Sequence, residues 1–132
     1  MKTIKELQNE LLRIGQIINA NEDYLRIGEG VDVIIDVKIH GDEYHYIVIE
    51  RGNEQKRIIT NSSFELMFLF ISSAAFSLSS RYAANNKIPG QDFRRLMFQH
   101  YLELLRRIGP RWEKRGQQKI DEILKKYPYE DE

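Results

Sequence analysis

The feature that most constrains the fold is a run of apolar side chains from Phe64 to Leu78, which continues around nearly every side of a helix. Ser62 and Glu65 form a capping-box pattern at its start, and we expect the helix to reach about Ala84. A helix that is apolar nearly all round must be covered on several sides. The run is shorter than the roughly 18–20 residues that a bilayer crossing needs. It therefore predicts a core helix, packed between a sheet and other helices.

The residues before this helix change from a helical to an alternating pattern. Residues 3–19 place apolar side chains at three- and four-residue spacing, which predicts an amphipathic helix. Alternating segments then follow, separated by short turns at Gly41 and Gly52. The predicted strands are 31–39, 44–51 and 55–60, with 24–27 as a candidate fourth. Because short turns join antiparallel neighbours, we expect a meander.

Helical spacing returns in the rest of the chain, over residues 91–107 and from 110 to the residue before Pro128. Gly109-Pro110 separates these two helices, since glycine commonly follows one helix and proline opens the next. The predicted class is α+β: an N-terminal helix, an antiparallel meander of three to four strands, then three helices packed on the sheet. We expect a single domain over residues 1–132, because no linker or repeat divides it.

Composition and motifs exclude several classes of function. The chain has no cysteine, which excludes disulfide scaffolds, cysteine-ligated metals and thiol nucleophiles. It lacks the motifs of zinc proteases, serine hydrolases, P-loop proteins and dinucleotide-binding proteins. The serines of the core run, Ser72, Ser73, Ser77, Ser79 and Ser80, have no histidine or lysine at an activating spacing. We expect them to admit a close neighbouring helix, and we expect a cytoplasmic protein without a signal peptide, a cofactor or a bound metal.

His40 and His45 flank the first predicted hairpin turn, which also contains Asp42 and Glu43. If the two imidazoles pair across the hairpin, they form a weak metal site with a neighbouring carboxylate. An ordinary polar hairpin tip explains the same residues more simply. A metal-dependent hydrolase built on this hairpin is therefore the least favoured of the functions considered.

The net charge is zero, with 20 basic and 20 acidic residues, but the charges are unevenly placed. Residues 22–54 contain nine acidic and three basic residues, whereas residues 81–119 contain ten basic and three acidic residues. An acidic sheet can dock on a basic protein surface. Basic helices can instead bind nucleic-acid phosphates, but these are spread around two helices without a nucleic-acid-binding motif. Mutual attraction between the two regions explains the pattern as well.

Two motifs in the second half resemble the immunity protein 63 family of bacterial polymorphic toxin systems. The first is Gly90-Gln91-Asp92-Phe93-Arg94-Arg95-Leu96-Met97-Phe98, and the second joins Trp112 to Ile120-Asp121-Glu122-Ile123-Leu124 and Tyr127-Pro128-Tyr129. The resemblance covers a little under half the chain. It implies a protein without enzymatic activity that is encoded beside a toxin and neutralises it by binding. The motif residues Gln91, Asp92, Phe93, Arg94, Arg95, Trp112 and Tyr127 are expected to be structural, with Phe93 and Trp112 as core anchors.

We therefore expect an immunity protein that binds a cognate toxin domain through its acidic sheet region. The predicted contact residues are Asp32, Asp36, Asp42, Glu43, Tyr44, Tyr46 and Glu50. Tyr44 and Tyr46 share a strand face, and aromatic side chains are common at binding hot spots, although packing under a helix explains them as well. The alternative function is a nucleic-acid or nucleotide-binding module that uses the basic C-terminal helices.

Overall fold

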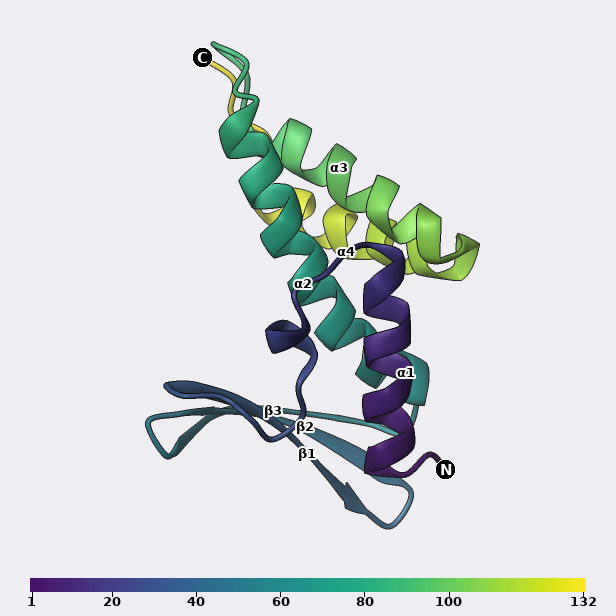
Figure 1. The fold of residues 1–132 in the computed structure, drawn as a ribbon. Coiled ribbons are helices and arrows are strands. Elements are labelled where there is room, and N and C mark those ends of the chain that lie inside the picture. Colours follow the sequence, from purple (N-terminus) through teal and green to yellow (C-terminus); the bar gives the residue numbers. More distant parts are fainter. The chain divides into compact units, whose positions relative to one another are not determined.

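The computed structural model describes all 132 residues and has the predicted α+β architecture (Figure 1). Its elements are α1 (Ile4–Ile17), the short 3₁₀ helix η1 (Glu22–Leu25), β1 (Val33–His40), β2 (Glu43–Glu50), β3 (Asn53–Thr60), α2 (Ser63–Asn85), α3 (Phe93–Ile108) and α4 (Pro110–Lys126). The N-terminal helix, the three-stranded meander and the three later helices are confirmed. The candidate fourth strand at 24–27 does not form, because η1 begins there instead.

The chain divides into two compact units. The first contains residues 1–16 and 21–71, and the second contains residues 17–20 and 72–132. Unit 1 has twelve acidic and eight basic residues, a net charge of −4, whereas unit 2 has eight acidic and twelve basic residues, a net charge of +4. The uneven charge of the sequence thus follows the boundary between the units. The expectation of a single domain stays a prediction.

The sheet of unit 1 is an antiparallel meander in the order β1-β2-β3. A shift of register between Val48 and Ile49 leaves Gln55 of β3 without a partner in β2, as in a β-bulge. Lys56 follows at once on this outer strand. A bulge and a lysine hinder an exposed edge from pairing with another chain, so β3 ends the sheet.

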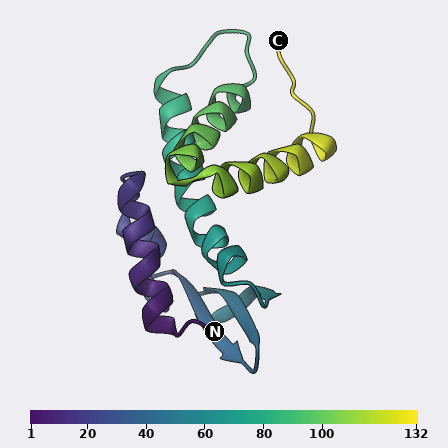
Figure 2. The same ribbon diagram turned by 90° about the vertical axis from the view of Figure 1, so that its right-hand side faces the viewer.

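One face of the sheet packs against helices, since α1 and the first turns of α2 both rise from it (Figures 1 and 2). The ring of Tyr46 meets Phe70 of α2 edge-on, with centroids 5.1 Å apart. The Tyr44 hydroxyl accepts a hydrogen bond from the Lys2 amide at 2.8 Å. Only 2% of Tyr44 and 8% of Tyr46 is exposed. The expectation that these tyrosines form part of an exposed contact surface is therefore wrong, because both side chains lie on the covered face of the sheet.

Side-chain bonds cap the start of α1 and tie its N-terminal half to η1. Thr3 and Glu6 form a full capping box, in which Thr3 Oγ1 accepts from the Glu6 amide and Glu6 Oε1 accepts from the Thr3 amide, both at 3.1 Å. Further along, Gln8 Nε2 donates to the Leu25 carbonyl at 2.7 Å, and Gln8 Oε1 accepts from the Ile27 amide at 2.8 Å. These bonds hold η1 against α1 and leave Leu25 fully buried.

Helix α2 contributes to the core of both units. It has 23 residues, so its predicted extent to about Ala84 is confirmed. By length and composition alone the whole helix is long enough to cross a membrane, although the apolar run 64–78 is shorter. However, 56% of its most apolar 18-residue window is buried inside the structure, which is typical of a core helix. Its buried apolar residues are Leu66, Met67, Phe68, Phe70, Ile71, Ala74, Ala75 and Ala83.

In unit 2, α3 and α4 diverge from the junction at Gly109 (Figure 2). Their closest approach is at Gly116, where an added Cβ would overlap Leu105 Cδ1 and lie 3.1 Å from Tyr101 Cε2. Tyr101 is fully buried against α2, where its hydroxyl bonds Ser72 Oγ at 2.7 Å. Burial raises the pKa of Tyr101 to about 12. Ser72 thus serves helix packing, as we expected of the serines in this run.

We predict that Gly116→Ala lowers the free energy of unfolding, because the methyl group would be forced against Leu105, which is fully buried and cannot move aside. The net loss should be about 1–2 kcal/mol, because alanine's better helix propensity offsets part of the overpacking. Urea denaturation measures it. The control Gln118→Ala, at an exposed position of α4, should change stability by about 0.5 kcal/mol or less. Equal stability of the two variants would contradict the close packing.

Candidate functional site

The sheet face opposite the helices carries no helix of unit 1 (Figures 1 and 2). Over β1 it is partly covered by a loop, because the Gly28 amide donates to the Ile35 carbonyl at 2.8 Å and an added Cβ on Gly28 would lie 3.2 Å from Asp36 Oδ1. Over β3 the face is open, with Ile59 51% exposed, whereas Ile47 of β2 is only 2% exposed. We call the residues that share it the open sheet patch: Lys38, His40, Glu43, His45, Ile47, Glu54, Arg57 and Ile59.

Arg57 organises the polar groups of the open sheet patch. Its guanidinium donates to both carboxylate oxygens of Glu54, at 3.0 and 2.7 Å, and to His45 Nδ1 at 2.9 Å. The bonds from Arg57 hold the pKa of the Glu54 carboxyl below its usual value. Glu43 Oε1 lies 3.7 Å from His45 Nε2, and the ring of His40 lies 4.4 Å from the ring of His45. The patch is therefore a mixed surface with a pre-arranged polar network.

The two histidines lie on neighbouring strands of the hairpin but do not pair as the metal hypothesis requires, since Lys38 pairs with His45 and His40 pairs with Glu43. Their rings, however, contact each other at an interplanar angle of 50°. No group of three or more histidine, aspartate or glutamate side chains in the 132 residues is arranged to hold a metal ion. The hairpin is thus described best as a polar surface.

The structure separates the predicted acidic contact residues into two groups. Asp42 lies in the β1–β2 turn and Glu43 begins β2, so both border the open sheet patch. Asp32 and Glu50 lie at the other end of the strands, where the Arg51 amide donates to the Asp32 carbonyl at 3.0 Å. A strand of this length spans about 25 Å. Asp36, half-buried, lies between the two groups, so the predicted residues do not form one cluster.

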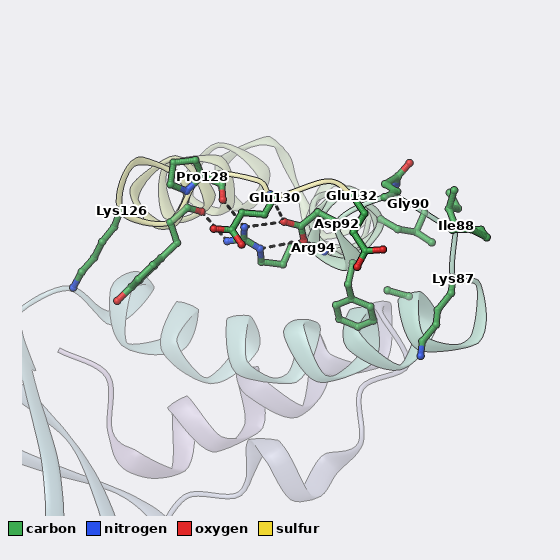
Figure 3. A pocket seen from close by; sticks show the side chains of 15 residues that line it. Lys87, Ile88, Gly90, Asp92, Arg94, Lys126, Pro128, Glu130 and Glu132 are labelled. Carbon is green, nitrogen blue, oxygen red and sulfur yellow. Dashed lines mark hydrogen bonds and ion pairs between the residues drawn. The ribbon is translucent and has the colours of Figure 1, made fainter.

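In unit 2, the family-like motif residues hold the C-terminal residues of the chain (Figure 3). Asp92 caps the N-terminus of α3, where its carboxylate accepts from the Arg94 amide at 2.9 Å and from the Glu130 amide at 2.8 Å. Arg94 in turn donates to the carbonyls of Tyr127 and Pro128, each at 2.8 Å. The tail therefore completes the start of a helix that lies far away in sequence.

A second ion pair extends this clamp. Arg95 contacts both oxygens of Asp131, at 2.9 to 3.1 Å, and its guanidinium lies over the ring of Tyr129, 4.1 Å from the centroid. Asp131 Oδ1 also accepts from the Asp92 amide at 2.7 Å. Asp92, Arg94 and Arg95 thus hold the tail against the start of α3, and the structural role expected of the motif residues stays a prediction.

Beside the clamp lies a cavity of about 1030 Å³ (Figure 3). Ile88, Phe93 and Tyr127 line it and are 48%, 40% and 59% exposed. Phe93 is therefore not a core anchor, because it is the first residue of α3 and lines the cavity. Trp112, the other expected core anchor, is only half-buried. Gln91 is half-buried on the cavity wall. The position of Phe93 at the first turn, next to its cap, is a signal that could have shown this.

The basic helices are partly neutralised by ion pairs within unit 2. The pairs are Arg94–Asp92, Arg95–Asp131, Arg106–Glu113 and Arg107–Glu103, with distances of 2.8 to 3.3 Å. Four of the ten basic residues counted in the sequence thus carry a carboxylate partner. This pairing reduces the charge that is left for nucleic-acid phosphates.

Sequence spacing did not reveal one further pair, Ser79 and His100, whose Oγ and Nδ1 lie 3.1 Å apart. Tyr82 stacks on the imidazole with centroids 4.2 Å apart. Burial lowers the pKa of His100, which favours its neutral form. Because Ser79 is fully buried, a substrate has no access to its hydroxyl, and the pair serves the packing of α2 on α3.

Comparison with known protein families matches residues 41–122 to the family described as Immunity protein 63. The chain belongs to the immunity protein 63 family. No curated protein and no solved structure matches the chain. The family match includes β2, β3, α2 and α3, so it extends well beyond the motifs that resembled this family in the sequence. It leaves out β1 and the C-terminal tail, although both are integral to the structure of this family member.

We predict that Asp92 makes the stability of this family member sensitive to acid. The bonds from Arg94, then those from the backbone amides of Glu130 and Arg94, hold the pKa of the Asp92 carboxyl well below its usual range. In the unfolded chain the pKa of this carboxyl is about 4. The stabilisation by ionised Asp92 is therefore complete above that pH and is lost as the pH falls from there toward the folded-state pKa.

Asp92→Asn removes this titration and keeps the size of the cap. We expect the unfolding free energy of the variant to fall less steeply than that of the wild type between about pH 4 and pH 2. Urea unfolding at a series of pH values measures both curves. Parallel curves would show that the folded and unfolded carboxyls titrate alike, contrary to the clamp.

Proposed function

We propose that this chain is an immunity protein that neutralises a cognate bacterial toxin domain by binding to it in the cytoplasm, without a catalytic step of its own. The observation that carries the proposal is membership of the immunity protein 63 family over residues 41–122. The burial of α2 inside the structure supports a soluble protein that meets its partner in solution. Neutralisation then requires only a surface that is complementary to the toxin.

The surface that we propose is the open sheet patch together with Asp42. It combines the half-exposed Ile59 with charged residues around it, as protein interfaces combine an apolar centre with a polar rim, while Ile47 is buried. A standard interface buries about 800 Å² on each partner, which a sheet face and its hairpin turn can supply. Asp42 and Glu43 add negative charge that speeds and directs the encounter with a basic partner.

The decisive experiment uses the toxin domain encoded by the gene next to this one. We expect its expression to stop growth of a bacterial host and co-expression of this chain to restore growth. The two purified proteins should form a complex with a stoichiometry of one to one. If growth is not restored and no complex forms, the proposed function is wrong.

Charge reversal tests the surface. We expect Asp42→Lys with Glu43→Lys to weaken toxin binding by about tenfold or more and to reduce the dependence of affinity on salt. The matched control is Asp32→Lys with Glu50→Lys, which makes the same change of charge at the far end of the strands and should stay within about threefold of the wild type. Titration calorimetry at two salt concentrations measures both. A larger loss in the control pair would place the contact surface at the other end of the sheet.

A further inference from the structure

His45 contains the one buried side-chain nitrogen or oxygen atom of the structure that has no hydrogen-bond partner, Nε2. The other ring nitrogen, Nδ1, lies 2.9 Å from Arg57 Nη1. Because a guanidinium can only donate, Nδ1 must accept this bond, and the proton of the neutral imidazole is therefore on Nε2. The unsatisfied atom is thus an N–H donor whose tautomer is fixed by Arg57.

The position of this donor indicates a partner. The closest acceptor, Glu43 Oε1, lies 3.7 Å away, beyond hydrogen-bond distance. The His45 side chain is only 11% exposed, so water does not readily replace the missing acceptor. A buried donor without an acceptor costs about 1–3 kcal/mol. In a folded protein such a cost calls for an explanation, and here the donor belongs to an uncovered sheet face.

We propose that His45 is a hydrogen-bond anchor of the toxin interface. Its Nε2–H donates to a main-chain carbonyl of the toxin, while an apolar side chain of the same toxin segment packs on Ile59. This inference rests on the proposed function and names the chemistry of the partner at that surface. Arg57 is the positioning residue, because it presents the correct tautomer.

The neighbours of His45 select a neutral acceptor. A carboxylate of the toxin would have to approach Glu43, and the two negative charges would repel each other. A main-chain carbonyl accepts the bond without this penalty. Ile59 pairs with His45 across the strands and is 51% exposed, so an apolar side chain next to that carbonyl finds a surface to cover. In the proposed complex the exposed side chains of His40 and Glu43, which lie next to the His45 ring, rotate to give access to Nε2.

The test separates binding from stability in the full-length protein, with the toxin domain encoded by the adjacent gene as the probe. His45→Phe removes both ring nitrogens and leaves an aromatic ring of similar shape. We expect its affinity for the toxin to fall about tenfold while its melting temperature stays the same or rises, because the unsatisfied donor is gone. His45→Gln restores an N–H near the position of Nε2 and should bind within about threefold of the wild type.

The matched control is His100→Phe, which makes the same substitution at a histidine of unit 2 outside the open sheet patch and should leave affinity within about threefold of the wild type. Unchanged toxin binding by His45→Phe would overturn the anchor and leave the proposed function standing. A lower melting temperature of His45→Phe, with no recovery of binding in His45→Gln, would also overturn it, since His45 would then be a structural residue. If the wild type does not bind the toxin domain, both proposals fail.

Discussion

The burial of α2 is the constraint on which the rest of the structure depends. A helix of 23 residues that is apolar on nearly all sides through most of its length must be covered on several sides, and only its last turn is mostly exposed. Its first turns are covered within unit 1, where Phe70 meets Tyr46 of the sheet. Its later turns are covered within unit 2, where Ser72 and Phe76 meet Tyr101 of α3. The other elements therefore pack on either the first or the later turns of α2. The sheet face that points away from α2 carries no helix of unit 1.

Most of the fold could be predicted because its signals are local. Alternation and helical spacing gave all the main elements, and Gly109-Pro110 marked the junction of the last two helices. Local patterns do not show which face of a strand is covered. For this reason Tyr44 and Tyr46 were wrongly predicted to be exposed. Phe93 was wrongly predicted to be a core residue although its position in the first turn of α3, next to the cap, was a local signal of exposure.

The placement of charge could likewise be predicted only in part from the sequence. A count along the sequence correctly separates an acidic from a basic region, since the sum depends on no contact. Ion pairing does depend on contacts, and Arg95 finds Asp131 across 36 positions of the chain. Likewise, the bond from Arg57 to His45 comes from the register of β2 and β3, which composition cannot supply. The acidic residues were therefore easy to find, whereas the histidine that we propose as the anchor required the structure.

The clamp between the tail and α3 has a consequence for the order of folding during synthesis. Residues 1–71 contain all of unit 1, so its sheet can assemble while later residues are still being added. Unit 2 has to wait, because Arg94 also binds the carbonyls of Tyr127 and Pro128, and Asp92 also accepts from the Glu130 amide. Until those residues leave the ribosome, the start of α3 is held only by the bonds between Asp92 and Arg94, and α3 covers the apolar second half of α2 without the support of the tail. The nascent chain thus passes through a stage at which this half-helix is covered less firmly, when chaperone contact or aggregation is most probable.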